Sequence, residues 1–419
     1  MKLSGYAFLE SLLMFGVRPG LDTTQTLCDA LNSPQESFET IHVVGTNGKG
    51  STSYYLSLIL SAHGKKTGLY TSPHLVSLRE RLRIGNIPVS EMELNEALLE
   101  VQQAAIQTKI TPTYFEALTV AAFLICRNKK IDVLVAEAGL GGKFDATAIA
   151  QGKMTVLTSI GLEHTAVLGY TLEAILGEKL GIMKKKSKLV HFPIPEHLRQ
   201  EFEKQKKIIE FQEVPNYSFP CPSLKNKGIH YKENAKLALS AAQNFLEESF
   251  KKEIAENALK NVFWPGRMQL LYDKQGNLKF ILDGAHNSHA ITRLAETLNT
   301  EFPNQKFPTL LGVLQDKDLK EMLNILQNHI LKYYPVRTPY ERFRNTETMT
   351  QEILNLGFMA ENAGMISREL LYQIANENKT PILITGSLYL IGACIEFLKE
   401  DFDDLTFFRG MKLENNEKH

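Results

Sequence analysis

The sequence predicts an α/β protein with a first domain on a mostly parallel sheet and a smaller, Rossmann-like α/β domain after it. From residue 40 onward, short apolar runs rich in β-branched residues alternate with longer helical stretches, which is the pattern of parallel βαβ units. A glycine-rich loop joins the first of these runs to a helical stretch. The alternation starts again after Pro265-Gly266, a pair that breaks regular structure. We therefore expect two domains, residues 1–262 and 263–419.

The expected elements follow the apolar pattern in chain order. Residues 199–227 are polar and contain prolines, and their pattern predicts no element. In the first domain the pattern predicts strands at 41–44, 68–70, 133–136, 155–158 and 189–191, and helices at 51–62, 91–107, 115–126, 172–183 and 233–247. In the second domain it predicts strands at 280–282, 309–313 and 381–384, and helices at 290–298 and 388–398.

Length, composition and charge narrow the class of protein. A chain of 419 residues is long enough for two domains with separate cores. Lys plus Arg number 47 and Asp plus Glu number 47, which argues against a dedicated surface for nucleic acid or anionic membranes. With 43% hydrophobic and 22% charged residues, the whole chain is neither disordered nor fibrous.

The cysteines and the N-terminal segment indicate the compartment. Four scattered cysteines without a CxxC pair indicate neither a disulfide framework nor a cysteine zinc site. Glu10 interrupts the apolar run of residues 1–20 and no small-residue cleavage site follows, so we interpret this segment as an amphipathic helix and not a signal peptide. No apolar stretch reaches the roughly 18 residues of a membrane span. We expect a cytoplasmic protein.

The glycine-rich loop predicts a phosphate site. Residues 41–52, IHVVGTNGKGST, have the order strand, loop and helix start. Backbone N–H groups in such a loop point at an anion, and a lysine adds positive charge for the β- and γ-phosphates. The match to GxxxxGK[ST] is imperfect, because Val43 stands where the pattern has Gly and Gly50 separates Lys49 from Ser51. The ordinary alternative is a glycine-rich βα turn without a ligand.

Several further motifs follow the glycine-rich loop in the sequence. Together with the loop they resemble the motifs of the folylpolyglutamate synthase and dihydrofolate synthase branch of the Mur ligase superfamily, in the same order, over about residues 16–392. The motifs are GTNGKGS (45–51), TSPHL (71–75), ERLRI (80–84), YFEALT (114–119), EAGLGGKFDAT (137–147), TSIGLEHT (158–165), GEKLGI (177–182), WPGR (264–267), LDGAHN (282–287), DKD (316–318) and TGSLYL (385–390).

The sequence departs from the family's pattern at a few positions. Glu163 stands where Asp is usual, and Lys143, Ala148, Ser288 and Arg79 replace the usual Arg, Asn, Pro and Asn. Lys143 lacks the planar fork of an arginine, and Arg79 would alter the folate side. None of these changes removes a residue expected to bind metal or ATP.

The resemblance implies an ATP-dependent ligase and its cofactors. Such an enzyme joins L-glutamate to dihydropteroate or to a folate through an acyl phosphate, and the first step depends on positioning and charge neutralisation. The first domain would be the ATPase domain, and the site would lie in the cleft between the domains. The implied cofactors are ATP, two Mg²⁺ ions and a CO2-derived carbamate on one lysine. We expect a monomer that acts on small molecules and binds neither nucleic acid nor membrane.

The resemblance also assigns the site residue by residue. The catalytic residues would be Lys49, Lys179, His164 and His286. The ATP-binding residues would be Gly45, Thr46, Asn47, Gly48, Lys49, Gly50, Ser51, Asn234, Arg267 and Asp283. The metal ligands would be Ser72, Glu137, His164 and carbamylated Lys179, and the folate side would include Arg18, Thr71, Ser72 and Arg81.

Each of these assignments has an ordinary structural alternative. Lys49 could be a solvated lysine at a helix start, and Glu137 could cap a helix or form a salt bridge. His164 could be a hydrogen-bonded core residue, because histidine is an unusual magnesium ligand. Lys179 could lie on a solvated helix face, and His286 could pack beneath the sheet.

Two other functions compete with the folate ligase. A Mur-type ligase would act on UDP-linked N-acetylmuramoyl peptides, but no separate UDP-binding domain precedes Gly45 in this sequence. A nucleotide-binding module without catalysis would not need Lys49, Glu137, His164 and Lys179. The acceptor stays open between dihydropteroate, folates and both, and we favour a bifunctional enzyme.

Overall fold

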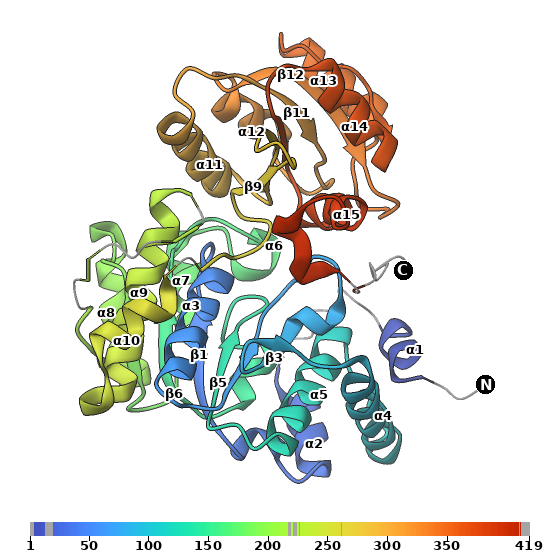
Figure 1. Cartoon of the computed structure of the whole chain (residues 1–419). Coiled ribbons are helices and arrows are strands. Elements are labelled where there is room, and N and C mark those ends of the chain that lie inside the picture. Colours follow the sequence, from blue (N-terminus) through green and yellow to red (C-terminus); the bar gives the residue numbers. More distant parts are fainter. Residues whose placement is uncertain are drawn as a thin grey trace.

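Two α/β bodies lie one above the other in the computed structural model, which describes residues 4–12, 20–216, 219–220, 224–225, 227–260, 262–409 and 411 (Figure 1). One sheet takes its strands from the segment between β1 and β8, and the other takes its strands from β9 to β14. Both sheets are mostly parallel. The expected α/β class is confirmed.

The first sheet has eight strands in the order β4-β3-β2-β5-β1-β6-β7-β8. The six neighbouring strands β2, β5, β1, β6, β7 and β8 run parallel to one another. At one edge, β3 and β4 are antiparallel to their neighbours. The bounds are β1 (Glu39–Val44), β2 (Thr67–Tyr70), β3 (Leu82–Ile84), β4 (Ile87–Pro88), β5 (Val133–Glu137), β6 (Gly152–Leu157), β7 (Lys188–His191) and β8 (Gln212–Glu213).

Helices cover both faces of this sheet because its central strands are apolar on both sides. Ile41 and Val135 belong to the same core cluster as residues of α3, α9 and α10. Leu134 and Ala136 belong to the cluster that contains α2, α4 and α5. The helices are α1 (Gly5–Glu10), α2 (Asp22–Ala30), α3 (Lys49–Ala62), α4 (Glu91–Thr108), α5 (Tyr114–Asn128), α6 (Thr165–Leu168), α7 (Leu172–Leu180), α8 (Arg199–Ile209), α9 (Ile229–Leu246) and α10 (Lys252–Leu259), with 3-10 turns η1 (Pro34–Glu36), η2 (Leu78–Arg81), η3 (Ala146–Ile149), η4 (Glu196–Leu198) and η5 (Glu247–Ser249).

The second sheet has six strands in the order β13-β12-β11-β14-β10-β9, with only β9 antiparallel to its neighbour. One core cluster joins it to α11, α12 and α13, and another joins it to α14, α15 and η6. The bounds are β9 (Gln269–Tyr272), β10 (Leu278–Asp283), α11 (Ser288–Glu301), β11 (Phe307–Leu311), α12 (Leu319–Leu326), β12 (Ile330–Arg337), α13 (Thr346–Asn355), β13 (Gly364–Met365), α14 (Arg368–Glu377), β14 (Ile382–Thr385), α15 (Leu388–Leu398) and η6 (Asp403–Phe408).

Every expected strand and helix overlaps an observed one, and several observed elements were not expected, among them β12, α13 and α14. The helix expected over 172–183 ends at Leu180, where Gly181 donates its backbone N–H to Gly177 and Lys179 and caps the last turn. The stretch that predicted no element contains α8, in which Phe202 is the one buried residue, so its apolar period is too weak to read.

The strand order determines where the site lies. The chain leaves β1 toward β2 and β5 on one side, whereas β6 pairs with the other side of β1. In open parallel sheets such a reversal opens a crevice at the carboxyl ends of the strands. The loop after Val44 lies at this crevice, below the second body (Figure 1).

Candidate active site

The loop between β1 and α3 needs glycine at two positions. Gly45 and Gly48 have φ of 146° and 85°, in the region that favours glycine. A Cβ on Gly45 would lie 1.9 Å from Oγ1 of Thr158, and one on Gly48 would lie 2.7 Å from Oδ1 of Asn234. The loop therefore passes between the end of β6 and helix α9 without room for a side chain.

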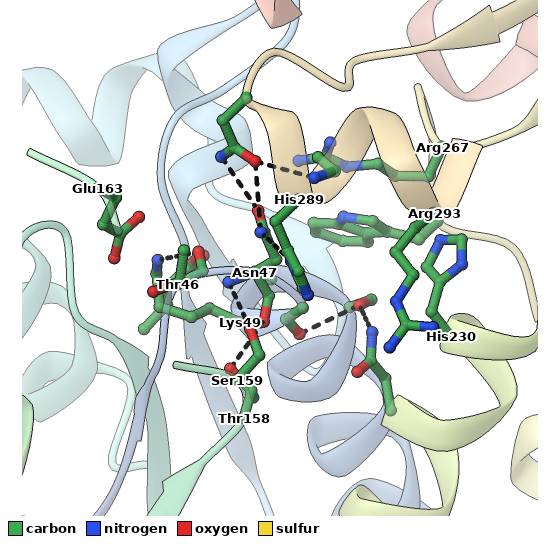
Figure 2. A pocket seen from close by; sticks show the side chains of 18 of the residues that line it. Thr46, Asn47, Lys49, Thr158, Ser159, Glu163, His230, Arg267, His289 and Arg293 are labelled. Atoms are coloured by element: carbon green, nitrogen blue, oxygen red, sulfur yellow. Dashed lines mark hydrogen bonds between the residues drawn. The ribbon is translucent and has the colours of Figure 1, made fainter. Parts of the chain in front are cut away.

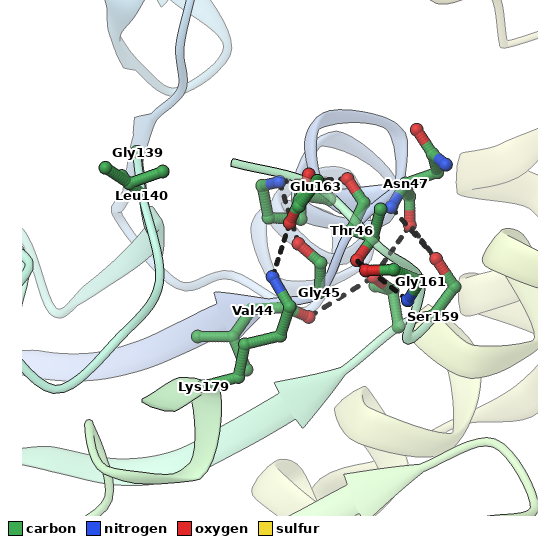
Figure 3. A network of polar contacts seen from close by, with 12 residues as sticks. Val44, Gly45, Thr46, Asn47, Gly139, Leu140, Ser159, Gly161, Glu163 and Lys179 are labelled. Carbon is green, nitrogen blue, oxygen red and sulfur yellow. Dashed lines mark hydrogen bonds and ion pairs between the residues drawn. The ribbon is translucent and has the colours of Figure 1, made fainter. Parts of the chain in front are cut away.

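The loop is held in shape by the segment that follows β6 (Figure 3). The N–H of Thr46 donates to the carbonyl of Ser159 at 2.7 Å, and the N–H of Asn47 donates to its hydroxyl at 2.9 Å. The hydroxyl of Thr158 donates back to the carbonyl of Asn47 at 2.8 Å. These bonds direct the loop toward the start of α3, a helix of 14 residues whose first N–H groups are suited to an anion.

Lys49 is the first residue of α3 and lies over the loop. Its Nζ donates to the carbonyls of Gly45 and Thr46 at 2.8 and 3.1 Å. An ammonium in this position faces the space above the helix N-terminus. There its charge and the partial positive charge of the helix N-terminus both attract an anion.

A cavity of about 610 Å³ opens above this loop and reaches the second body. In Figure 2, Arg267 and His289 face the loop residue Asn47. The Asn47 Nδ2 lies 2.7 Å from Nδ1 of His289, which joins the loop directly to α11. Of the expected site residues the cavity wall contains Thr46, Asn47, Gly48, Lys49, Gly50, Ser51, Thr71, Ser72, Glu137, His164, Asn234, Arg267, Asp283 and His286.

Glu137 ends β5 and is a buried carboxylate on the cavity wall. Its Oε2 accepts the N–H of Ser72 at 3.0 Å, so the two expected metal ligands are adjacent. Burial raises the pKa of Glu137 to about 7, which the positive charge of Lys49 partly offsets. A buried carboxylate of this kind is stabilised by a bound cation.

Lys179 and Glu163 form an ion pair beside the loop (Figure 3). Lys179 is fully buried at the end of α7, and its Nζ lies 2.5 Å from Oε1 of Glu163. Burial and the charge of Lys49 lower the pKa of Lys179 to about 8. The longer side chain of Glu163, where the family usually has Asp, makes this contact.

His164 follows Glu163 and begins helix α6 in the left-handed conformation, with φ of 45°. Burial lowers its pKa, so its imidazole is mainly neutral at pH 7, as a metal ligand must be. Among the described residues, however, no three His, Cys, Asp or Glu side chains gather as a metal site. The expected set contains only two such residues and would rely on the Ser72 hydroxyl and a modified lysine.

The second body supplies an acid, a cation and a histidine. The buried carboxylate of Asp283 accepts the N–H groups of Met268 and Ala285 at 2.8 and 2.9 Å and thereby orders the segment after Arg267. His286 Nδ1 lies 2.8 Å from the carbonyl of Gly284, and burial lowers its pKa to about 4. A neutral His286 that donates from Nδ1 has Nε2 as an acceptor.

Three expected residues lie behind the cavity wall and one lies outside the described residues. Gly45, Lys179 and Arg81 do not line the cavity, and Arg18 is among the residues that the structure does not describe. Arg81 is buried and donates from Nε to Nδ1 of His74 at 2.9 Å. Ser51 lines the cavity while its Oγ accepts the amide of Asn234 at 2.9 Å.

Several residues on the cavity wall had no predicted role. They include His230 and His289, which no periodic pattern distinguishes from ordinary polar residues, whereas Arg83 belongs to the motif ERLRI. For His230 and His289 the signal is only their closeness in sequence to Asn234 and His286. Within the residues that the structure describes, no helix is both long and apolar enough to cross a membrane.

Comparison with known sequences finds one domain family and full-length relatives. A family model described as "Dihydrofolate synthetase, C-terminal domain" matches residues 266–397. The dihydrofolate synthase/folylpolyglutamate synthase of Bacillus subtilis is 31% identical over 428 residues, which cover 94% of this chain and 98% of that protein.

Solved structures are similar over the same length. The structure of Escherichia coli FolC in complex with DHPP and ADP has a TM-score of 0.80 and 26% identity, covering 94% of this chain and 96% of that one. The bifunctional folylpolyglutamate synthase/dihydrofolate synthase of Yersinia pestis, complexed with AMPPNP and Mn ion, has a TM-score of 0.80 and 26% identity and covers 93% and 96%. The resemblance drawn from the motifs is confirmed, and the chain belongs to the dihydrofolate synthase/folylpolyglutamate synthase family of ATP-dependent ligases of folate metabolism.

Proposed function

We propose that the chain joins L-glutamate both to dihydropteroate and to reduced folates. We also propose that it consists of two domains, with the boundary between residues 262 and 263. The observation that carries the proposal is the cavity that the loop at Lys49 shares with Arg267 and His286. A helix N-terminus on one wall and a guanidinium on the other are suited to a nucleotide phosphate chain. The name of the Bacillus subtilis relative covers both activities, and the Escherichia coli structure contains DHPP beside ADP, which supports the double acceptor range.

The reaction consists of two substitutions. In the first, a carboxylate oxygen of the acceptor attacks the γ-phosphorus of ATP, the bond to ADP breaks and an acyl phosphate forms. In the second, the amino nitrogen of glutamate attacks the acyl carbon, loses a proton and displaces inorganic phosphate. We assign Lys49 to the charge on the transferred phosphate, and the neutral Nε2 of His286 to a hydrogen bond accepted from the attacking amine, whose proton passes to solvent.

The remaining nucleotide contacts follow the cavity wall. We assign to the phosphates the N–H groups of 45–51 other than those of Thr46 and Asn47, which Ser159 already accepts, and we assign Asn234, Arg267 and Asp283 to the rest of the nucleotide. Asp283 also accepts the hydroxyl of Tyr231, a residue of α9, at 3.3 Å, so this carboxylate connects nucleotide binding to the approach of the two bodies.

Magnesium fits the residues on the first sheet. Glu137 is a buried carboxylate without an ion-pair partner among the described residues, and Ser72 and His164 lie on the same wall. Hard oxygen ligands are those that Mg²⁺ prefers. We propose that Ser72, Glu137 and His164 hold one ion, which would supply a Lewis acid for the phosphate oxygens. The Mn ion in the Yersinia pestis structure supports a divalent metal.

We also propose that Lys179 carries a carbamate that binds a second Mg²⁺. The amine must be neutral to attack CO2, and its pKa of about 8 makes that form accessible. The reaction forms an N–C bond, releases a proton and changes the side chain from cation to anion. Since Glu163 lies beside it, the carbamate would place two negative charges together, which a cation offsets. Modification and metal binding are therefore expected to occur together.

Substitution of Lys179 tests the carbamate. Lys179→Ala is expected to lower turnover by about 10²-fold or more, because a metal ligand is lost, and acetate or formate should restore part of it by occupying the vacated space. Lys184→Ala removes a half-buried lysine of lowered pKa outside the cavity. This variant should keep its turnover, and neither acetate nor formate should change it. Mass spectrometry of active enzyme that shows only plain lysine at 179, with Mg²⁺ and bicarbonate present, would remove the assignment.

The acceptor is tested by direct assay. Purified protein is given ATP, Mg²⁺ and L-glutamate with dihydropteroate, with tetrahydrofolate or with a UDP-linked N-acetylmuramoyl precursor, and the products are resolved by mass spectrometry. Glutamate addition to both pterin acceptors is the expected result. Turnover with the UDP precursor alone would make the chain a Mur-type ligase, and nucleotide binding without turnover would make it a silent module.

We propose that the enzyme acts as a monomer in the cytoplasm on small molecules alone. The expected site residues that line the cavity all belong to a single chain, as a monomeric enzyme requires. Analytical ultracentrifugation at assay concentrations checks this, since an active dimer with an inactive monomer would contradict it.

A further inference from the structure

Arg83 is a buried arginine on the cavity wall that the proposed reaction does not use. It lies in β3, is 3% exposed and lines the cavity together with Ser72 and Glu137. An arginine stays charged at physiological pH, and a buried charge is costly unless it has a partner. Arg83 belongs to the motif ERLRI but is not among the expected site residues.

Three aromatic rings surround the Arg83 guanidinium. Its Cζ lies 5.5 Å from the ring centroid of Tyr54, 5.1 Å from that of Trp264 and 4.8 Å from that of Phe407. These rings come from α3, from the segment between the two sheets and from η6. Stacking on ring faces holds a guanidinium in one plane and leaves the N–H groups along its edge available.

The terminal N–H groups of Arg83 have no hydrogen-bond partner among the described residues. The only hydrogen bond of Arg83 there runs from Nε to the carbonyl of Glu80, at 3.5 Å. The carboxylate of Glu80 supplies a negative charge near Arg83, but its oxygens accept the backbone N–H groups of Leu75, Val76 and Ser77 at 3.3, 2.7 and 2.6 Å. The two terminal nitrogens of Arg83 are thus available for an anion from the cavity.

The location of Arg83 relates it to the reacting carboxylate. A Cβ built on Gly50 would lie 3.4 Å from Oε2 of Glu137 and 3.5 Å from the indole of Trp264. The ring that stacks on Arg83 therefore borders the expected metal site. The planar edge of an arginine matches a carboxylate with two parallel hydrogen bonds.

We propose that Arg83 binds the α-carboxylate of a glutamyl group, either on the incoming L-glutamate or on the tail of a glutamylated acceptor. This inference rests on the proposed function, since both compounds are its substrates. Dihydropteroate has no α-carboxylate, so it would use Arg83 only through the incoming amino acid.

Trp264 is the sole tryptophan of the chain and reports on this site directly. We would titrate the fluorescence of the full-length protein, in the presence of ADP, with L-glutamate and separately with γ-L-glutamyl-L-glutamate. Because this measures binding without turnover, it gives a result even if the acceptor assay fails. In Arg83→Met the dissociation constant of at least one of the two compounds should rise tenfold or more, with that of ADP unchanged.

Kinetics then separate the two sources of the carboxylate. If Arg83 binds the incoming amino acid, Arg83→Met raises the KM for L-glutamate with every acceptor. If Arg83 binds the acceptor tail, the variant raises the KM of glutamylated folates and leaves that of dihydropteroate unchanged. Either result supports the proposal, and Arg83→Lys should be less impaired than Arg83→Met because it keeps the charge.

Two matched variants test whether Arg83 is merely a packing residue. Phe407→Leu removes one stacked ring but keeps the guanidinium, so its affinities should stay within about threefold of wild type. Arg368→Met removes an exposed arginine that stacks on Tyr372 far from the cavity and should change no affinity. Wild-type affinities for both compounds in Arg83→Met, or equal losses in Phe407→Leu, would overturn the proposal.

Discussion

Lys49→Ala is expected to lower glutamate-dependent turnover on the order of 10³-fold while leaving the fold intact. The ammonium lies at the N-terminus of α3 on the cavity wall, where charge develops on the transferred phosphate. Its present partners are the carbonyls of Gly45 and Thr46, and the loss of such bonds on a half-buried residue changes the free energy of unfolding by about 1 kcal/mol. Steady-state kinetics and thermal denaturation measure the two effects.

An exposed lysine provides the control. Lys207 lies on the exposed side of α8, and Lys207→Ala should keep both turnover and stability. Lys49→Arg should recover part of the activity, because the charge remains with altered geometry. Turnover in Lys49→Ala within a few fold of wild type would contradict the assignment of Lys49 to the transferred phosphate.

Glu137→Gln is expected to abolish most turnover and yet to stabilise the metal-free fold at pH 8. The amide keeps the shape of the side chain and can still accept the N–H of Ser72, but it is a poor ligand for Mg²⁺. Loss of metal-assisted charge neutralisation should lower turnover on the order of 10³-fold.

The stability effect follows from the raised pKa of Glu137. Burial raises this pKa to about 7 from the usual 4.5, so the folded chain holds the proton more tightly than the unfolded chain. The resulting contribution to stability is fully present below pH 4.5 and is lost as the pH rises through 7. Relative to pH below 4.5, the metal-free fold therefore loses about 3 kcal/mol of stability at pH 8, where the buried carboxyl is ionised, and about 1 kcal/mol at pH 5, where only the unfolded chain ionises it.

Denaturation with and without metal checks both signs. In EDTA at pH 8, Glu137→Gln should unfold at a higher temperature than wild type, and the difference should shrink at pH 5. Added Mg²⁺ should stabilise wild type and not the variant. Glu116→Gln, which changes a buried carboxylate outside the cavity, should leave the effect of Mg²⁺ unchanged. A variant less stable than wild type at pH 8 without metal would contradict the burial argument.

Apolar periodicity predicts the buried elements of this fold and misses elements whose pattern is mixed. The strand at 41–44 and the helix at 51–62 are buried on several sides, so their residues are almost all apolar or small. β12 is a central strand that contains Pro335 and the half-exposed Lys332, and neither residue is typical of a strand. α13 and α14 bury few residues against the second sheet, which leaves too little pattern to predict them.

The site divides in the same way between local and distant information. The loop at Lys49 is contiguous in sequence, so its residues alone predict a phosphate site. The approach of Asn47 to His289, and of Arg83 to Phe407, depends on how the two bodies pack, which no local pattern contains. Glu163 pairs with Lys179 at a position where Asp is usual, and this departure is visible in the sequence although the contact is not.

The transfer of oxygen from the acceptor to phosphate is the most direct measurement of the proposed chemistry. Dihydropteroate labelled with ¹⁸O in its carboxylate is incubated with the enzyme, ATP, Mg²⁺ and L-glutamate, and the inorganic phosphate is analysed by mass spectrometry. Activation through an acyl phosphate predicts one ¹⁸O atom in phosphate for each amide bond formed. Amide formation with unlabelled phosphate would show that the acceptor carboxylate never attacks the γ-phosphorus.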